Sequence, residues 1–348
     1  MTPACRYVGK GVPAYNTEPG LWPYGCHRFP MKKISPLISP YPAFYPRARG
    51  FSLVELIVVI VVTGIMAATV GLFIAGPIQA FFDQARRGGL VDAAQLAQLR
   101  MGRDLRGALP NSVRVSGSTA IEMLYTLDGD RYRTEPPGLG DDRLDFTGTD
   151  TQFNTLAPLA RPESNPLSWS RTSGHLAIYP LQATGTGANP YTTTTDRVMT
   201  AAATPLAPIQ FTSVCVTMGS PPVCAGGTLE FRVQMPSFQF AFDSPTKRVF
   251  LVEGPVSYVC GDDPGETDPA RLALFRYSGY GVNAIQPVPP DVSLVGTMAV
   301  IVKNVTACNF VYAPGTAQRN AVVSLALTLT SQGESILLLR QVQVDNSP

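Results

Sequence analysis

The pattern of hydrophobic and polar positions is most pronounced near the start of the chain. No ionisable residue occurs between Glu55 and Asp83, and the first twenty positions of this stretch, Leu56–Ala75, are almost all apolar. Twenty helical residues span roughly 30 Å, the hydrocarbon thickness of a bilayer. A buried core helix of about 10–14 apolar residues, or a secretory signal with an apolar region of about 7–15, would be shorter. The pattern therefore predicts a transmembrane helix.

A different periodicity follows at the next positions. Between Ile78 and Leu109 apolar residues recur every three or four positions, which is typical of a helix with one buried stripe. This stripe consists of Ala94, Ala97, Met101, Leu105 and Ala108, whereas the charged residues, Asp104 among them, are expected on other faces. Because Pro110 cannot continue a helix, we expect one helix from about 52 to 109.

Short alternating runs broken by Gly, Pro, Asn and Asp begin at Val113, and they predict β-strands. The candidate strands are Ile121–Tyr125, Leu144–Phe146, His175–Tyr179, Leu229–Val233, Val249–Val252, Arg271–Phe275, Ala299–Val302, Val322–Thr330 and Ser335–Val344. The last two read as a hairpin around Ser331–Glu334, with the turn type left open. The expected fold class is α+β, with a long helix packed on an antiparallel sheet that carries long loops.

Charge is distributed unevenly along the chain. Only 15% of the residues are charged and the formal net charge is +2. Residues 1–50 hold seven Lys/Arg and one acid, whereas residues 51–348 hold 20 basic and 24 acidic residues and are therefore near −4. Basic residues before an apolar helix place the N-terminus in the cytoplasm and the remainder outside. The arginines of the second helical half lack aromatic neighbours, so we expect no nucleic-acid partner.

An acidic residue stands directly before the apolar run, in the sequence Gly50-Phe51-Ser52-Leu53-Val54-Glu55-Leu56. A carboxylate beside hydrocarbon is costly and needs a structural or functional reason. One reason is a helix capping box, in which Ser52 is the N-cap and Glu55 reaches back to the Ser52 amide.

The same seven residues, after a basic leader, resemble the processing site of type IV prepilins and pseudopilins. The resemblance implies that a prepilin peptidase cuts between Gly50 and Phe51 and methylates the new amine, and that Glu55 pairs with the N-terminal amine of a neighbouring subunit. The implied partners are this peptidase, other pilins through the N-terminal helix, the inner-membrane assembly platform, and the lipid bilayer before assembly.

This resemblance implies a division of the chain into four parts. Residues 1–50 would be a removed leader, in which 1–30 are an extension or a misplaced start, because Met31-Lys32-Lys33 reads as an ordinary translation start. Residues 51–82 would form the transmembrane helix, 83–109 an amphipathic stalk helix, and 110–348 a β-rich head exported to the periplasm.

Further segments, 85–87, 101–115 and 338–346, resemble minor pilin-like proteins of mannose-sensitive haemagglutinin (MSHA) pilus systems. The junction at 101–115 also resembles the J-type minor pseudopilins of type II secretion. Three function classes stay open: a structural pilus or pseudopilus subunit, a tip subunit that binds a surface or carbohydrate, and a membrane-anchored enzyme. The enzyme is disfavoured, because His175 is the one histidine after residue 50 and no nucleophile elbow or phosphate loop occurs.

Four cysteines, Cys215, Cys224, Cys260 and Cys308, follow the leader. An even number in an exported domain indicates two disulfides with three possible connectivities, of which we favour pairing of nearest neighbours. No C-x₂₋₄-C spacing supports zinc. An acidic run offers oxygen ligands for Ca²⁺ but reads better as a turn, so no cofactor is expected. Its carboxylates belong to Asp262, Asp263, Glu266 and Asp268.

Overall fold

The computed structural model describes residues 50–134, 143–164, 166–193, 195–216, 228–263, 265–268, 270–289, 296–315 and 319–347. The chain divides into two units, Met1–Ile65 and Met66–Pro348. One helix, α1 (Leu53–Arg106), belongs to both and continues through Pro77. It is the long apolar helix that the sequence predicts, and it ends three residues before the expected position. Arg103 and Arg106 lie in its last turn, where positive charge complements the helix dipole.

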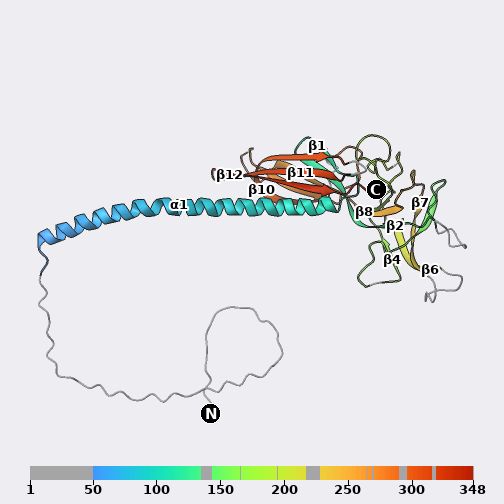
Figure 1. The fold of residues 1–348 in the computed structure, drawn as a ribbon, viewed down its shortest axis with the longest axis horizontal. Coiled ribbons are helices and arrows are strands. Elements are labelled where there is room, and N and C mark those ends of the chain that lie inside the picture. Colours follow the sequence, from blue (N-terminus) through green and yellow to red (C-terminus); the bar gives the residue numbers. More distant parts are fainter. Residues whose placement is uncertain are drawn as a thin grey trace, which may run out of the picture. The chain divides into compact units, whose positions relative to one another are not determined.

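Most strands of the head form one antiparallel sheet of eight strands, which we call the large sheet (Figure 1). Its main path follows the order β1-β2-β8-β9-β10-β11-β12, and β5 pairs with β8 away from this path. The strands are β1 (Arg114–Ser116), β2 (Ala120–Arg131), β5 (His175–Ala177), β8 (Arg248–Asp262), β9 (Leu272–Ser278), β10 (Thr297–Ala313), β11 (Ala321–Ser331) and β12 (Glu334–Val344).

A second antiparallel sheet of four strands, the small sheet, is built from the chain between β2 and β8. Its order is β3-β7-β6-β4, with β3 (Asp150–Thr155), β7 (Thr228–Phe238), β6 (Ile209–Val216) and β4 (Ser168–Arg171). Of these strands the sequence pattern predicts only β7, and the predicted strand Leu144–Phe146 is wrong, since the structure has no strand there.

The predicted hairpin of β11 and β12 is present, and its turn can now be named. Ser331 pairs with Glu334, so the loop contains only Gln332 and Gly333. Both residues have positive φ, 48° and 85°. Two consecutive left-handed residues define a type I′ turn, whose twist matches that of the flanking strands.

The second half of α1 packs on the large sheet through the predicted stripe. Ala94, Ala97, Met101 and Leu105 are at most 1% exposed, and they share a core cluster with inward-facing residues of β11 such as Leu327. Full burial of a Met or Leu side chain contributes about 1.5–3 kcal/mol, so this stripe holds the helix on the sheet.

Polar contacts supplement the apolar packing of α1. The Gln98 Nε2 group donates to the carbonyl oxygens of Leu325 at 3.1 Å and Leu338 at 2.9 Å. Arg86 donates to Gln332, and Arg87 pairs with Glu334 at the hairpin turn. Side chains on one helix thus contact both strands and the turn of the last hairpin.

Candidate processing and assembly site

The start of α1 is fixed by Ser52. The Glu55 amide donates to Ser52 Oγ at 3.1 Å, and the Leu56 amide donates to the Ser52 carbonyl at 3.1 Å. A hydroxyl that accepts from the third helical amide is the N-cap arrangement, and it satisfies one of the donors that a helix start leaves free. Ser52 therefore has the capping role that the sequence pattern indicates.

The other half of the capping box is missing. The Glu55 carboxylate accepts no hydrogen bond from the Ser52 amide. It also forms no hydrogen bond or ion pair with any other residue that the structure describes. Phe51, directly before the cap, is 80% exposed. The helix start therefore presents a carboxylate and an aromatic side chain that find no partner among the described residues of their own chain.

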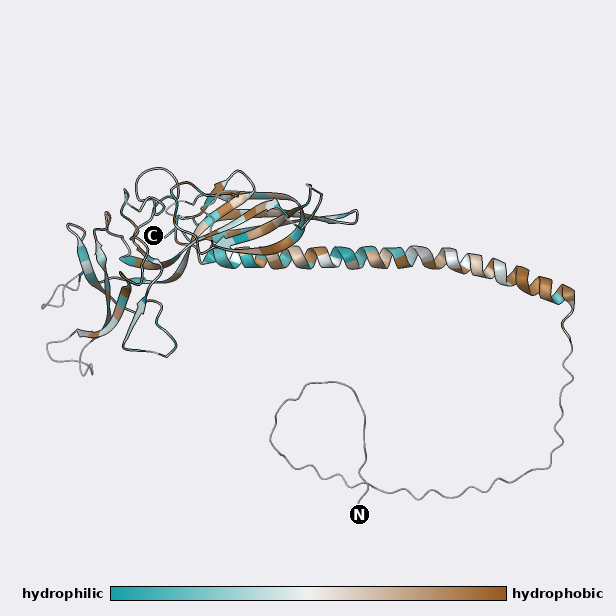
Figure 2. Ribbon diagram, turned by 180° about the vertical axis from the view of Figure 1, so that it is seen from behind, coloured by the Kyte–Doolittle hydropathy of each residue, from teal (hydrophilic) through white to brown (hydrophobic). Residues whose placement is uncertain are grey.

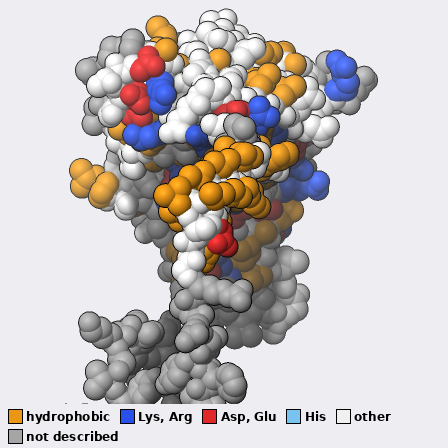
Figure 3. Space-filling view, turned by 90° about the vertical axis from the view of Figure 1, so that its left-hand side faces the viewer, with side chains coloured by type: hydrophobic (Ala, Val, Ile, Leu, Met, Phe, Trp, Pro, Cys, Tyr) orange, Lys and Arg blue, Asp and Glu red, His pale blue; other side chains and the backbone are white. Residues whose placement is uncertain are grey.

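The apolar residues after Glu55 are just as exposed. Leu56, Val61 and Phe73 expose 56%, 54% and 82% of their surfaces. Figure 2 shows this hydrophobic band at the N-terminal end of α1, and Figure 3 shows hydrophobic side chains along the helix surface. Among the described residues, α1 is the one helix that is long and apolar enough to cross a membrane, with a mean hydropathy of 2.7 over 18 residues. Its exposure fits membrane anchoring.

Asp104 corrects the expectation that all charged residues of the stalk face away from the buried stripe. It is 8% exposed, and its Oδ2 atom accepts from Tyr258 Oη at 2.8 Å and from Arg276 Nε at 2.7 Å. Burial and the nearby carboxylate raise the pKa of Tyr258. The last turn of α1 is therefore joined to β8 and β9 through one buried carboxylate.

A second buried polar cluster, which the sequence does not predict, lies on β1 and β2. Glu122 is fully buried and paired with Arg114, and its Oε1 atom accepts from Tyr280 Oη at 2.8 Å. The Arg114 guanidinium also lies 3.6 Å from the ring centroid of Tyr191. Burial raises the pKa of Glu122. Since its groups are paired with one another, this cluster has a structural role.

The structure contains the disulfide Cys260–Cys308, with 6.5 Å between the Cα atoms. It joins β8 to β10 and lies in the core cluster that covers α1. This is the second of the two expected nearest-neighbour pairs. The expected Cys215–Cys224 pair involves Cys224, which lies outside the described residues, so that pair stays a prediction.

The acidic run proposed as a weak calcium site contacts cations of the protein itself. Asp263 accepts from the Gly265 amide at 3.1 Å and pairs with Lys303 at 3.0 Å. Arg271 lies 3.6 Å from Glu266 and 3.8 Å from Asp268. Within the described residues, no group of three or more His, Cys, Asp or Glu side chains could hold a metal ion, those of Asp262 to Asp268 included.

The described residues show no catalytic arrangement around His175. The ring is 7% exposed and its Nδ1 atom lies 2.8 Å from the Thr200 carbonyl oxygen. Burial lowers its pKa. This contact joins β5 to the neighbouring loop, so His175 has the hydrogen-bonded structural position that a lone strand histidine usually has.

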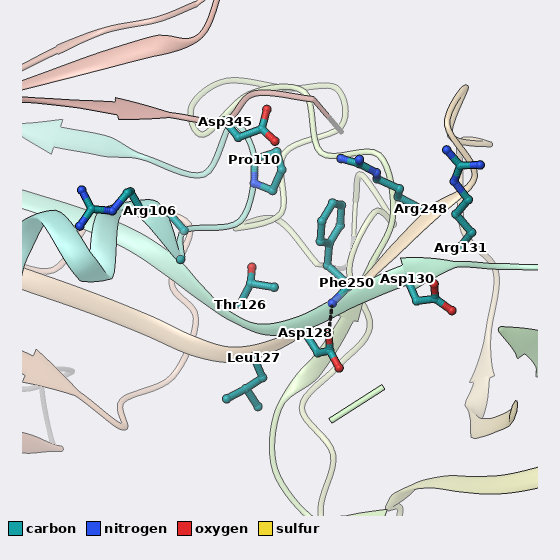
Figure 4. A pocket seen from close by; sticks show the side chains of 13 residues that line it. Arg106, Pro110, Thr126, Leu127, Asp128, Asp130, Arg131, Arg248, Phe250 and Asp345 are labelled. Carbon is teal, nitrogen blue, oxygen red and sulfur yellow. Dashed lines mark hydrogen bonds between the residues drawn. The ribbon is translucent and has the colours of Figure 1, made fainter. Parts of the chain in front are cut away.

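A cavity of about 480 Å³ lies where α1 ends, next to β2 and β8 (Figure 4). Its lining includes Thr126, three arginines and three aspartates, but no His, Cys or Lys among the described residues. The carboxylates of Asp128 and Asp130 accept from backbone amides, of Ala160 at 2.7 Å and of Ala157. Two of the three carboxylates in the lining are therefore already hydrogen-bonded to the backbone of the head.

Comparison with known proteins supports the interpretation of the N-terminal segment as a prepilin-type processing site. Residues 45–71 match the family model described as "Prokaryotic N-terminal methylation motif". No curated protein and no solved structure matches the chain. The match contains Gly50, Phe51, Ser52 and Glu55. It supports a type IV pilin-like chain that is processed by prepilin peptidase and takes part in pilin assembly. Such a motif indicates a structural subunit rather than an enzyme.

Proposed function

We propose that this protein is a minor pilin-like subunit of an MSHA-type pilus, close in kind to MshO, that initiates assembly or caps the filament tip. Prepilin peptidase cuts between Gly50 and Phe51 and methylates the Phe51 amine. One observation carries the proposal: within the N-terminal methylation motif, the Glu55 carboxylate has no partner among the described residues of its own chain, although the neighbouring Ser52 is bonded as the helix cap.

The physical argument concerns two charges at the edge of an apolar surface. Cleavage leaves an amine on Phe51 that is costly to bury alone, and the Glu55 carboxylate of a neighbouring subunit supplies the opposite charge. Removing one member of a buried ion pair costs about 3–5 kcal/mol, because the other is left uncompensated. A pair of this strength selects which subunits dock and at what axial position.

The location that we propose for the protein follows from the division of the chain into four segments. Residues 1–50 form the cytoplasmic leader, 51–82 cross the inner membrane, and 83–109 and 110–348 form the stalk and head in the periplasm. The Cys260–Cys308 disulfide supports export, since such bonds persist in oxidising compartments such as the periplasm.

The test is a Glu55→Gln substitution in the native host. Glutamine keeps the helix start but cannot neutralise an amine, so we expect normal cleavage and methylation together with a loss of most of the protein from sheared filaments. Glu253→Gln is the matched control, because Glu253 is an exposed glutamate of β8 in the head. Normal assembly of the Glu55→Gln protein would contradict the proposal and leave Glu55 with no role beyond the start of the helix.

A second candidate is a J-like minor pseudopilin of a type II secretion system, which the resemblance of residues 101–115 favours. Both candidates use the same processing and the same Glu55 pair. Deletion of the gene distinguishes them: a pilus subunit is needed for surface pili, whereas a pseudopilin is needed for secretion of exoproteins. Normal pili that fail to adhere would instead indicate a tip subunit with a binding role.

A further inference from the structure

The outward face of the small sheet carries a row of glutamines. Gln152 of β3 pairs with Gln234 of β7, which also pairs with Gln210 of β6, and Gln210 pairs with Ser170 of β4. Neighbouring strands lie about 4.8 Å apart, so residues in register on one face form a continuous row. Three side-chain amides and one hydroxyl therefore cross the sheet in a line.

The strand alternation explains why this row faces outward. The adjacent positions Phe153, Phe211 and Val233 are fully buried in the core of this part of the head. Gln210 and Gln234 are exposed and Gln152 is half-buried. No hydrogen bond joins these three amides to any described residue, so their donors and acceptors are free for a ligand.

The three glutamines of the row line a hollow of about 440 Å³. Apolar residues complete the lining, among them Leu206, Pro208 and Pro236, and no described lining residue is ionisable. Leu206 is 99% exposed. It is held in a turn closed by two 3.1 Å backbone hydrogen bonds between Thr204 and Ala207. An apolar side chain is thus fixed at the rim of an uncharged, amide-lined hollow.

We propose that this hollow binds a neutral carbohydrate. A glutamine amide presents a donor and an acceptor side by side, which suits the adjacent hydroxyl groups of a sugar ring. The apolar rim suits the C–H face of the same ring, and the volume lies in the usual range of small-ligand sites. Without a cation in the described lining, the hollow offers no counter-charge to an acidic sugar or a phosphate.

The position of the row also argues against an extended peptide. β6 and β7, which carry Gln210 and Gln234, are paired on both sides and offer a ligand their side chains rather than a free strand edge, whereas β3, which carries Gln152, is an edge strand. Within the unit from Met66 onward, β4, β6 and β7 lie beyond the end of α1 (Figure 1). No described residue of α1 lines the hollow.

The experiment uses the full-length protein in detergent micelles on a printed array of neutral hexose and N-acetylhexosamine oligosaccharides, with sialylated oligosaccharides alongside. The array is repeated with the triple variant Gln152→Ala, Gln210→Ala and Gln234→Ala. Gln341→Ala with Gln343→Ala is the matched control, because both are exposed glutamines of β12 on the large sheet.

We expect neutral oligosaccharides to bind and the triple variant to bind at least about ten-fold more weakly, since each lost hydrogen bond costs about two- to ten-fold. The control should bind as the unmodified protein does. Leu206→Asp should also weaken binding. Because Leu206 lies at an exposed turn position, this substitution should not disturb folding, and it tests the hollow even if the triple variant misfolds.

Binding of sialylated oligosaccharides alone, binding of no oligosaccharide, or equal binding by the folded triple variant would each overturn the proposal. The assay is independent of filament assembly, because Glu55→Gln leaves the hollow unchanged. Failure of the binding proposal therefore leaves the proposed subunit function standing, and the reverse also holds.

Discussion

The two halves of α1 differ in where their apolar surface finds a partner. Met66 is 61% exposed, whereas Met101, on the same helix, is completely buried against the large sheet. Polar groups follow the same division: the Glu55 carboxylate meets no described residue of its own chain, but Asp104 accepts hydrogen bonds from Tyr258 and Arg276. The second half of α1 thus packs against its own chain, whereas the first half finds no such partner among the described residues.

This difference indicates what each half is for. Apolar surface that a monomer leaves exposed over many residues is a site of membrane or protein interaction. In the proposed function, the partners of the first half are lipid before assembly and other subunits afterwards. The second half needs neither, because the sheet already covers it. The helix therefore carries a head whose stability should be independent of what surrounds the first half.

Removal of the Cys260–Cys308 disulfide should have the largest effect on the stability of the head, against which the second half of α1 packs. The bond lies in the core cluster under α1 and closes a loop with a sequence separation of 48. Cys260→Ser with Cys308→Ser should lower the free energy of unfolding of the head by about 4 kcal/mol. Chemical denaturation in micelles measures this loss, and membrane retention should stay unchanged. A shift of both properties together would mean that the halves are not independent.

A matched pair of methionine substitutions compares the two halves directly. Met101→Ala should lower the free energy of unfolding by about 2–5 kcal/mol, because it leaves a cavity in a packed core. Met66→Ala removes the same atoms from an exposed position and should change it by less than about 0.5 kcal/mol. Thermal melting of both proteins gives the comparison. Equal losses would show that the first half packs on the head after all.

The smallest change in the free energy of unfolding is expected from a pair of aspartate substitutions in α1. Asp104→Ala leaves the fully buried Tyr258 and the partly buried Arg276 without their shared acceptor. We expect a loss of about 2 kcal/mol, below the full cost for a completely buried ion pair. Asp92→Ala is the control, since Asp92 is exposed on the same helix. Denaturation curves that change equally for both variants would remove the assigned role of Asp104.

The large sheet was more predictable from the sequence than the small sheet. β11 alternates buried and half-buried residues over almost its whole length, which gives a clear strand signal. β4, in contrast, contains one apolar residue, Trp169, in four positions. β3 likewise has only Phe153 as an apolar residue. These short strands become strands because β6 and β7 pair with them, and pairing across distant segments leaves no local pattern.

The candidate site divides in the same way. The motif around Gly50 and Glu55 is contiguous, so the sequence alone predicts it. The charge of Asp104 predicts an exposed face, because its partners Tyr258 and Arg276 lie more than 150 positions away in the sequence. The glutamine row also depends on the register of four separate strands. Contacts of this kind become visible only when the strand pairing is known.

The central claim, that the first half of α1 begins at a processed phenylalanine whose amine is neutralised by another chain, is tested most directly at the mature N-terminus. Mass spectrometry of the protein from membranes of its own host should find a chain that starts at N-methylated Phe51. A chain that still carries Arg47, Arg49 and Gly50 would contradict the account and leave a membrane-anchored head with no assembly role.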